Sequence, residues 1–101
     1  MYFNMSEIVD ENSFKTFLQP VKEFRKHGIP SALAMQNDVN GIAWCLADYL
    51  PDLGIKYLWM GEHHYKSQVP FNMPTVFQWE SPSGKPILTY RADHYNTGNF
   101  W

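Results

Sequence analysis

Cysteine, long apolar runs and an excess of one charge are all missing from this chain, and each absence excludes a class of protein. The single cysteine, Cys45, cannot form an internal disulfide, so neither an oxidising compartment nor a cysteine-rich metal site is supported. We interpret Cys45 as packing material in a helix rather than as a nucleophile. No run of 18 apolar residues occurs, so we expect no membrane span.

The charged residues are few and nearly balanced, with 8 Lys and Arg against 10 Asp and Glu and a net charge of −2. A nucleic-acid partner would need a basic block to meet its phosphates, and no such block is present, so none is expected. The first six residues, MYFNMS, have neither the charged lead nor the apolar core of a secretory signal. The cellular location stays open.

Apolar residues make up 45% of the 101 residues and aromatic residues 17%, which is ample material for a core. The length fits one small domain but is short for a complete α/β barrel, which typically needs about 250 residues. The chain contains no internal repeat and no low-complexity segment.

Hydrophobic periodicity predicts an α/β fold. In chain order we predict a helix at 11–27, a strand at 31–36, a helix at 42–53, a strand at 55–60 and a hairpin at 76–90. Asp10 or Asn12 can cap the first helix, and Pro20 should kink or break it. Because a helix crosses over between the first two strands, those strands should be parallel.

The segment at 31–41, SALAMQNDVNG, is the most informative stretch. Its first half is apolar and uncharged, which is typical of a strand buried on both faces. Its second half becomes polar abruptly and places Asp38 at the carboxyl end of the strand, where ligands and chemistry collect in parallel sheets. An alternative stays open, in which Asp38 or Asn40 only caps the following helix.

Polar and ionisable side chains follow all three strands that should be neighbours. These groups are Gln36, Asn37 and Asp38, then Glu62, His63 and His64, then Arg91, Asp93 and His94. If the strands are parallel, the groups share one rim of the sheet. Carboxylates, imidazoles and a guanidinium together are the composition of a metal site or an acid–base site.

Each of these side chains also has a structural interpretation. His63 and His64 are adjacent, so in an extended segment at most one of them faces the rim, and either can simply form a hydrogen bond or lie on the surface. Five aromatic residues near the rim can stack on sugar faces or serve as core packing. They are Tyr65, Phe71, Tyr95, Phe100 and Trp101.

The segment at 34–41, AMQNDVNG, resembles the nucleophile strand of glycoside hydrolase family 38, the α-mannosidase family. In both, small or apolar residues lead to an Asp, and two positions separate that Asp from a Gly. The later stretches KYLWMG, FQWESPSGKPIL and RADHY are similar to bacterial members of the family. The resemblance covers about residues 10–100.

The resemblance implies a (β/α)7 barrel that holds zinc and cleaves glycosidic bonds with retention of configuration. One Asp of the family both binds zinc and attacks the anomeric carbon, and this role falls on Asp38. Retention agrees with a carboxylate nucleophile about 5 Å from its acid partner. A cation near the sugar hydroxyls would help to hold and polarise the substrate. The carbohydrate contacts are assigned to Asn37, His64, Tyr65, Asp93 and His94.

The chain also departs from the family pattern. Val39 and Asn40 replace the Pro-Phe pair that follows the nucleophile, and Ile42 replaces a His. The His-x-Asp zinc ligands, the separate acid/base Asp and the downstream ligand His have no matching segment in the 101 residues. We therefore expect residues 1–101 to be a partial catalytic domain, a barrel segment with parallel strands, crossover helices and a hairpin excursion.

Two other functions stay open. The chain can be a non-enzymatic carbohydrate-binding or interaction domain, or a metal-dependent hydrolase of another kind, such as a polysaccharide deacetylase. The latter would show an Asp-Asp or His-x-x-x-His motif, and neither is present. In the barrel interpretation the piece has unpaired strand edges and exposed apolar faces, so the isolated chain should be marginally stable or associate with itself.

Overall fold

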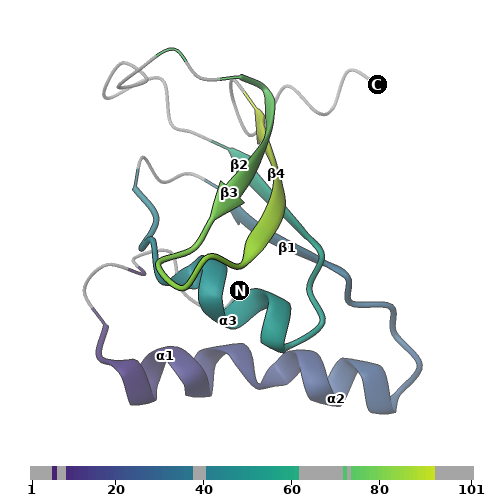
Figure 1. Ribbon diagram of the computed structural model, residues 1–101. Helices are drawn as coiled ribbons and strands as arrows, with labels where there is room; N and C mark the ends of the chain where they lie inside the picture. The colour runs from purple at the N-terminus through teal and green to yellow at the C-terminus, as the bar shows by residue number, and fades with distance from the viewer. Residues whose placement is uncertain (1–5, 7–8, 38–40, 62–71, 73, 93–101) are drawn as a thin grey trace.

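The computed structural model describes residues 6, 9–37, 41–61, 72 and 74–92 (Figure 1). In chain order its elements are α1 (Glu11–Leu18), α2 (Pro20–Lys26), β1 (Leu33–Asn37), α3 (Leu46–Asp52), β2 (Tyr57–Gly61), β3 (Val76–Glu80) and β4 (Pro86–Ala92). Within these ranges no helix combines the length and the apolar character that crossing a membrane requires.

The four strands form one mixed sheet in the order β1-β2-β4-β3. β1 pairs in parallel with β2, β2 pairs in parallel with β4, and β3 runs antiparallel beside β4. The predicted α/β class, the parallel pair joined by a crossover helix and the returning hairpin are confirmed. The sheet is partly antiparallel because β3 and β4 are the two strands of a hairpin, and β3 lies at the margin of the sheet. That it forms a segment of a barrel stays a prediction.

The helix expected at 11–27 is two helices. Asp10 caps α1 by accepting hydrogen bonds from the backbone N–H groups of Asn12 and Ser13, at 2.9 and 3.0 Å. Pro20 is the first residue of α2, where its missing N–H interrupts the helical ladder. Since Gln19 between them keeps helical backbone angles, α1 and α2 lie end to end (Figure 1). The break expected at Pro20 is therefore confirmed.

Helix α2 lies at the surface, where its partly buried Val21 packs against the core and polar contacts add to this attachment. None of its seven residues is buried. Its Arg25 guanidinium donates hydrogen bonds to the carbonyl of Leu53 and, at 2.7 Å, to the carbonyl of Ser31. Gly28, at φ 72°, takes the left-handed conformation that ends the helix and turns the chain toward β1.

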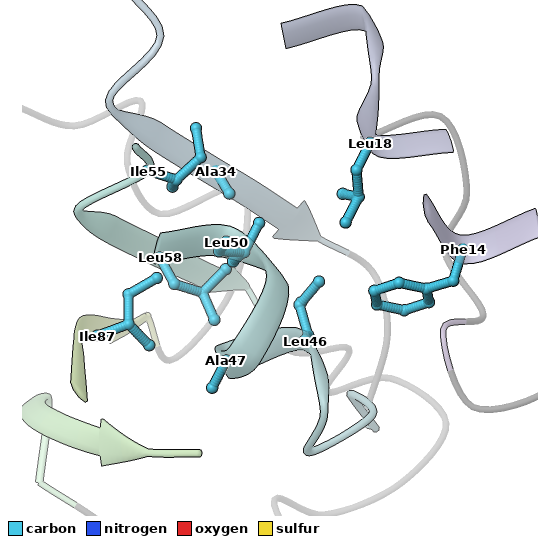
Figure 2. Packing of buried hydrophobic residues seen from close by; sticks show 9 residues of the cluster. All are labelled: Phe14, Leu18, Ala34, Leu46, Ala47, Leu50, Ile55, Leu58 and Ile87. Atoms are coloured by element: carbon cyan, nitrogen blue, oxygen red, sulfur yellow. The ribbon is translucent and has the colours of Figure 1, made fainter. Parts of the chain in front are cut away.

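The core lies between α1, α3 and one face of the sheet. Figure 2 shows side chains of α1 pointing toward α3, with the strands on the other side of α3. The cluster comprises Phe14, Leu18, Ala34, Leu46, Ala47, Leu50, Ile55, Leu58 and Ile87. Leu46, Ala47 and Leu50 are at most 1% exposed, so α3 is the most deeply buried helix of the described part.

Helix α3 is shorter than predicted, because it begins at Leu46 instead of residue 42. The backbone N–H of Ala43 donates to the hydroxyl of Ser6, at 2.8 Å, outside any helical ladder. Cys45 is the N-cap residue and is exposed, so its interpretation as packing material inside a helix is wrong. The same boundary excludes Asp38 and Asn40 as the N-cap of α3.

The expectation that β1 is buried on both faces is also wrong. Ala34 and Gln36 face the helices and are buried, whereas Leu33 and Met35 are 50% and 46% exposed. Side chains alternate along a strand, so an uncharged run can still present half of its residues to solvent when only one face is covered. We call this second face of the sheet the open face.

Side-chain contacts fasten the β3–β4 hairpin to α3 and to the residue that precedes its N-cap. The indole N–H of Trp44 donates to the carbonyl of Glu80 at 2.7 Å. Lys85 forms an ion pair with Asp52, also at 2.7 Å. The Ser83 hydroxyl and backbone N–H both donate to the carboxylate of Asp48. Together these contacts fix the hairpin turn against α3.

The burial pattern predicts where truncation weakens the fold. Leu50→Ala should lower the free energy of unfolding by about 2–5 kcal/mol, because it leaves a cavity in the core. Leu33→Ala, at a half-exposed position, is the matched control and should cost about 0.5 kcal/mol or less. Urea denaturation of both variants at low protein concentration measures the two losses. Equal losses would contradict the assignment of the core.

The Asp48 contact predicts a pH dependence. Hydrogen bonds from Ser81 and Ser83 hold the pKa of Asp48 below its ordinary value of 3.8. A lowered folded-state pKa contributes stability that is present above the ordinary value and lost as the pH falls through the folded-state value. Asp48→Asn should therefore shrink the difference between urea midpoints measured near about pH 6 and about pH 3. An unchanged difference would show that Ser83 does not hold this carboxylate.

Candidate functional site

The carboxyl ends of β1, β2 and β4 meet at one edge of the sheet. Asn37 is aligned with Gly61, and Gly61 is aligned with Ala92, so the three parallel strands end on a single register row. The condition of the prediction, that the three strands are parallel neighbours, is therefore met. We call this row, Asn37–Gly61–Ala92, the rim.

Most of the predicted site residues lie outside the described residues. These are Asp38, His64, Tyr65, Asp93 and His94, together with their neighbours Glu62 and His63. In the chain, Asp38, Glu62 and Asp93 each directly follow one member of the rim. Three carboxylic acids therefore come next in the sequence after three residues that share one register row.

Asn37 is the one predicted site residue that the structure describes. It is half-buried, and its side-chain oxygen Oδ1 is buried without accepting a hydrogen bond from any described residue. A buried oxygen without a donor costs about 1–3 kcal/mol. The stability of the described part of the chain therefore does not explain why an asparagine occupies the end of β1.

Arg91 and Asn37 lie on opposite faces of the sheet. It is aligned with Met60, on the face of the sheet that the helices cover, and is only 8% exposed. Asn37 follows the alternation of Leu33 and Met35 and belongs to the open face. The guanidinium that the sequence grouped with the rim thus belongs to the opposite face.

Two aromatic residues near the rim were not singled out from the sequence. Trp59 and Tyr90 are paired in register on the open face, two residues before the rim on their strands. Their ring centroids lie 4.4 Å apart with a 34° interplanar angle, and both rings are partly exposed. The signal that could have found them is the register itself, since each alone appears as an ordinary strand residue.

The described residues do not form a metal site. No group of three His, Cys, Asp or Glu side chains that could hold a metal ion occurs among them. A four-coordinate zinc site normally takes three or four protein ligands. A zinc site at the rim would therefore have to draw on residues outside the described ranges.

Comparison with known protein families gave one finding. A family model, described as the glycosyl hydrolases family 38 N-terminal domain, matches residues 1–100. Neither the curated proteins nor the solved structures gave a match. The match covers nearly the whole chain, including all seven helices and strands described above.

Asn37 provides a stability test of the rim. Asn37→Ala should leave the free energy of unfolding unchanged or raise it, because it removes a buried oxygen that no described residue satisfies. Gln36, the neighbouring amide on the helix-covered face, also has a buried side-chain oxygen without a described donor, but its side chain is only 2% exposed, so Gln36→Ala leaves a cavity and should lower the free energy of unfolding by more than about 1 kcal/mol. Urea denaturation compares the two. A loss at Asn37 as large as that at Gln36 would identify Asn37 as an ordinary structural residue.

Proposed function

The chain belongs to the glycosyl hydrolase family 38 N-terminal domain family, and from this premise we propose that it is part of a zinc-dependent, retaining glycoside hydrolase of the α-mannosidase type. Membership of the family indicates a glycoside hydrolase. The zinc dependence, the retaining mechanism and the mannoside substrate are the proposal. The observation that carries it is the rim, where three parallel strands end on one row directly before Asp38, Glu62 and Asp93.

Asp38 is the proposed nucleophile. It directly follows Asn37 at the carboxyl end of β1, and the competing role as N-cap of α3 belongs to Cys45. In a retaining mechanism its carboxylate attacks the anomeric carbon while a second carboxylic acid protonates the leaving oxygen. Water then attacks the glycosyl-enzyme ester, and the same second group takes the proton from that water. The second group is not assigned to a residue of this chain.

The remaining predicted residues are proposed to hold the sugar. Amide, imidazole, phenol and carboxylate groups can all form hydrogen bonds with sugar hydroxyls, and these groups follow the three strand ends that share the rim. They are Asn37, His64, Tyr65, Asp93 and His94. The partly exposed Trp59–Tyr90 pair lies just before the rim and adds an apolar surface there.

Zn²⁺ is the proposed cofactor, with Asp38 as its ligand from this chain. When bound, it would hold and polarise the sugar hydroxyls. The described residues supply no ligand set, and one carboxylate is too few for a tight site. We therefore propose that residues 1–101 form a partial catalytic domain of barrel type, which on its own binds zinc weakly.

The second candidate is a carbohydrate-binding module without catalysis. The Trp59–Tyr90 pair and the Asn37 amide favour it, because a partly exposed aromatic pair and an amide on the same face of the sheet can hold a sugar without any nucleophile. In that case the isolated chain binds a methyl α-mannoside and quenches or shifts tryptophan fluorescence, with no product formed.

Asp38→Asn separates the two candidates. In a catalytically active protein that contains this chain, the substitution should lower kcat on an aryl α-mannoside by several orders of magnitude, because the nucleophile acts mainly in the transition state. Binding of the intact substrate should fall far less. The matched control is Asp52→Asn, an exposed carboxylate at the end of α3, which should keep its turnover.

Two further readouts belong to the same experiment. Chelation should abolish the activity and added Zn²⁺ should restore it, and NMR should show that the first product retains the anomeric configuration. If the Asp38→Asn variant turned over the substrate at the ordinary rate, Asp38 would not be the nucleophile. If the activity resisted chelation, the enzyme would not depend on zinc.

A further inference from the structure

The chain segment that carries the proposed nucleophile is a short link between two fixed points. Asn37 is fixed in the sheet by its pairing with Gly61, and Ile42 is the next described residue that packs against the core. Residues 38–41 join these points, and Asp38 is the first of them. A short link has few arrangements once both of its ends are held. The contacts that hold its far end therefore bear on the position of Asp38.

Two hydrogen bonds hold the far end of this link. The backbone N–H of Ala43 donates to the hydroxyl of Ser6 at 2.8 Å, and the indole N–H of Trp44 donates to the carbonyl of Glu80 at 2.7 Å. Ser6 is only 3% exposed, so water competes little for its hydroxyl. The carbonyls of Ala43 and Trp44 accept from the first turn of α3. The two N–H bonds are thus the ones that reach beyond the helix.

The carbonyl that accepts from Trp44 is itself well fixed. Glu80 ends β3, and the turn that follows it is fastened to α3 by the Ser83 contact and by the Lys85–Asp52 ion pair. The chain before α3 therefore lies beside a hairpin that cannot move freely (Figure 1). The side chain of Trp44 is 59% exposed, so its hydrogen bond rather than its burial fixes this residue.

We propose that Ser6 and Trp44 are positioning residues for the nucleophile. By fixing residues 43 and 44 they restrict the link 38–41, and they thereby hold the Asp38 carboxylate in line with the anomeric carbon. A nucleophile has to lie within about 0.5 Å of its productive position, and a displacement of about 1 Å can cost about 100-fold in rate. Neither side chain needs to touch the sugar, because each acts through the backbone. The inference rests on the proposed role of Asp38.

The competing role is ordinary stabilisation of the contact between the hairpin and α3. Lys85 separates the two roles, because its ion pair with Asp52 joins the same hairpin to the same helix, at the end of α3 that is remote from the link. Lys85→Met is therefore the matched control. It removes one polar contact of the hairpin and leaves both hydrogen bonds at residues 43 and 44 in place.

Steady-state kinetics test the proposal in a catalytically active protein that contains this chain. Trp44→Phe and Ser6→Ala should each lower kcat on 4-nitrophenyl α-mannoside by about 10–100-fold, with KM within about threefold of the wild-type value. Ser6→Thr, which keeps the hydroxyl, should recover most of the lost kcat. Lys85→Met should keep kcat within about twofold.

A second substrate identifies which step is affected. The leaving group of 2,4-dinitrophenyl α-mannoside departs without protonation, so its kcat/KM reports attack by the nucleophile and not the work of the acid. Trp44→Phe and Ser6→Ala should lower this kcat/KM as well. Recovery of the wild-type value with this substrate would assign the defect to the acid and overturn the proposal.

Amide hydrogen exchange in the same protein measures the restraint without turnover. Exchange at residues 39–42 should become at least about fivefold faster in Trp44→Phe and Ser6→Ala, and should stay unchanged in Lys85→Met. Faster exchange with an unchanged kcat would show that the contacts hold the link without positioning the nucleophile. Equal losses of kcat in Lys85→Met and Trp44→Phe would show a merely structural role.

The two proposals fail in different ways. Ordinary turnover by Asp38→Asn would overturn the proposed nucleophile, whereas an inactive Asp38→Asn together with an unchanged kcat in Trp44→Phe would overturn the positioning role alone. Circular dichroism shows which variants are folded. If Ser6→Ala fails to fold, Trp44→Phe decides the matter, since it changes an exposed side chain.

Discussion

Parallel pairing of β1 with β2 and of β2 with β4 is the constraint on which the rest of the structure depends. Parallel strands cannot be joined by a tight turn, so the chain must cross the sheet between them, and α3 makes the first crossing. The hairpin lets β4 enter beside β2 while β3 takes the margin. The same pairing aligns the three carboxyl ends on one row, which the functional proposal requires.

The one-sided helical layer follows from this constraint. α3 presses Leu46, Ala47 and Leu50 against the sheet, and α1 covers α3 from outside with Phe14 and Leu18 (Figure 2). Every other residue of β1 and β2 therefore enters the core, while its neighbours form the open face. Buried Gln36 and half-buried Asn37 illustrate the division, because adjacent amides on one strand lie on opposite faces.

The sequence predicted the type and order of the elements because these depend on local patterns. Periodic apolar residues in α1, the helix-breaking effect of Pro20 and the turn before Lys85 can each be recognised within a few residues.

The start of α3 was missed, since no capping side chain marks it and Cys45 takes the N-cap position. The exposure of Leu33 and Met35 was missed because an apolar run does not reveal which neighbours cover it. The alignment of the rim could be expected, whereas the pairing of Trp59 with Tyr90 depends on a register that no local pattern contains.

Strand β1 leads to the proposed nucleophile. Its carboxyl end is followed directly by Asp38. A nucleophile needs its carboxylate held within about 0.5 Å of the productive position. Parallel pairing with β2 aligns Asn37 with Gly61, so the sheet fixes the backbone of the residue directly before Asp38. The proposed role of Asp38 therefore depends on the same strand pairing that orders the sheet.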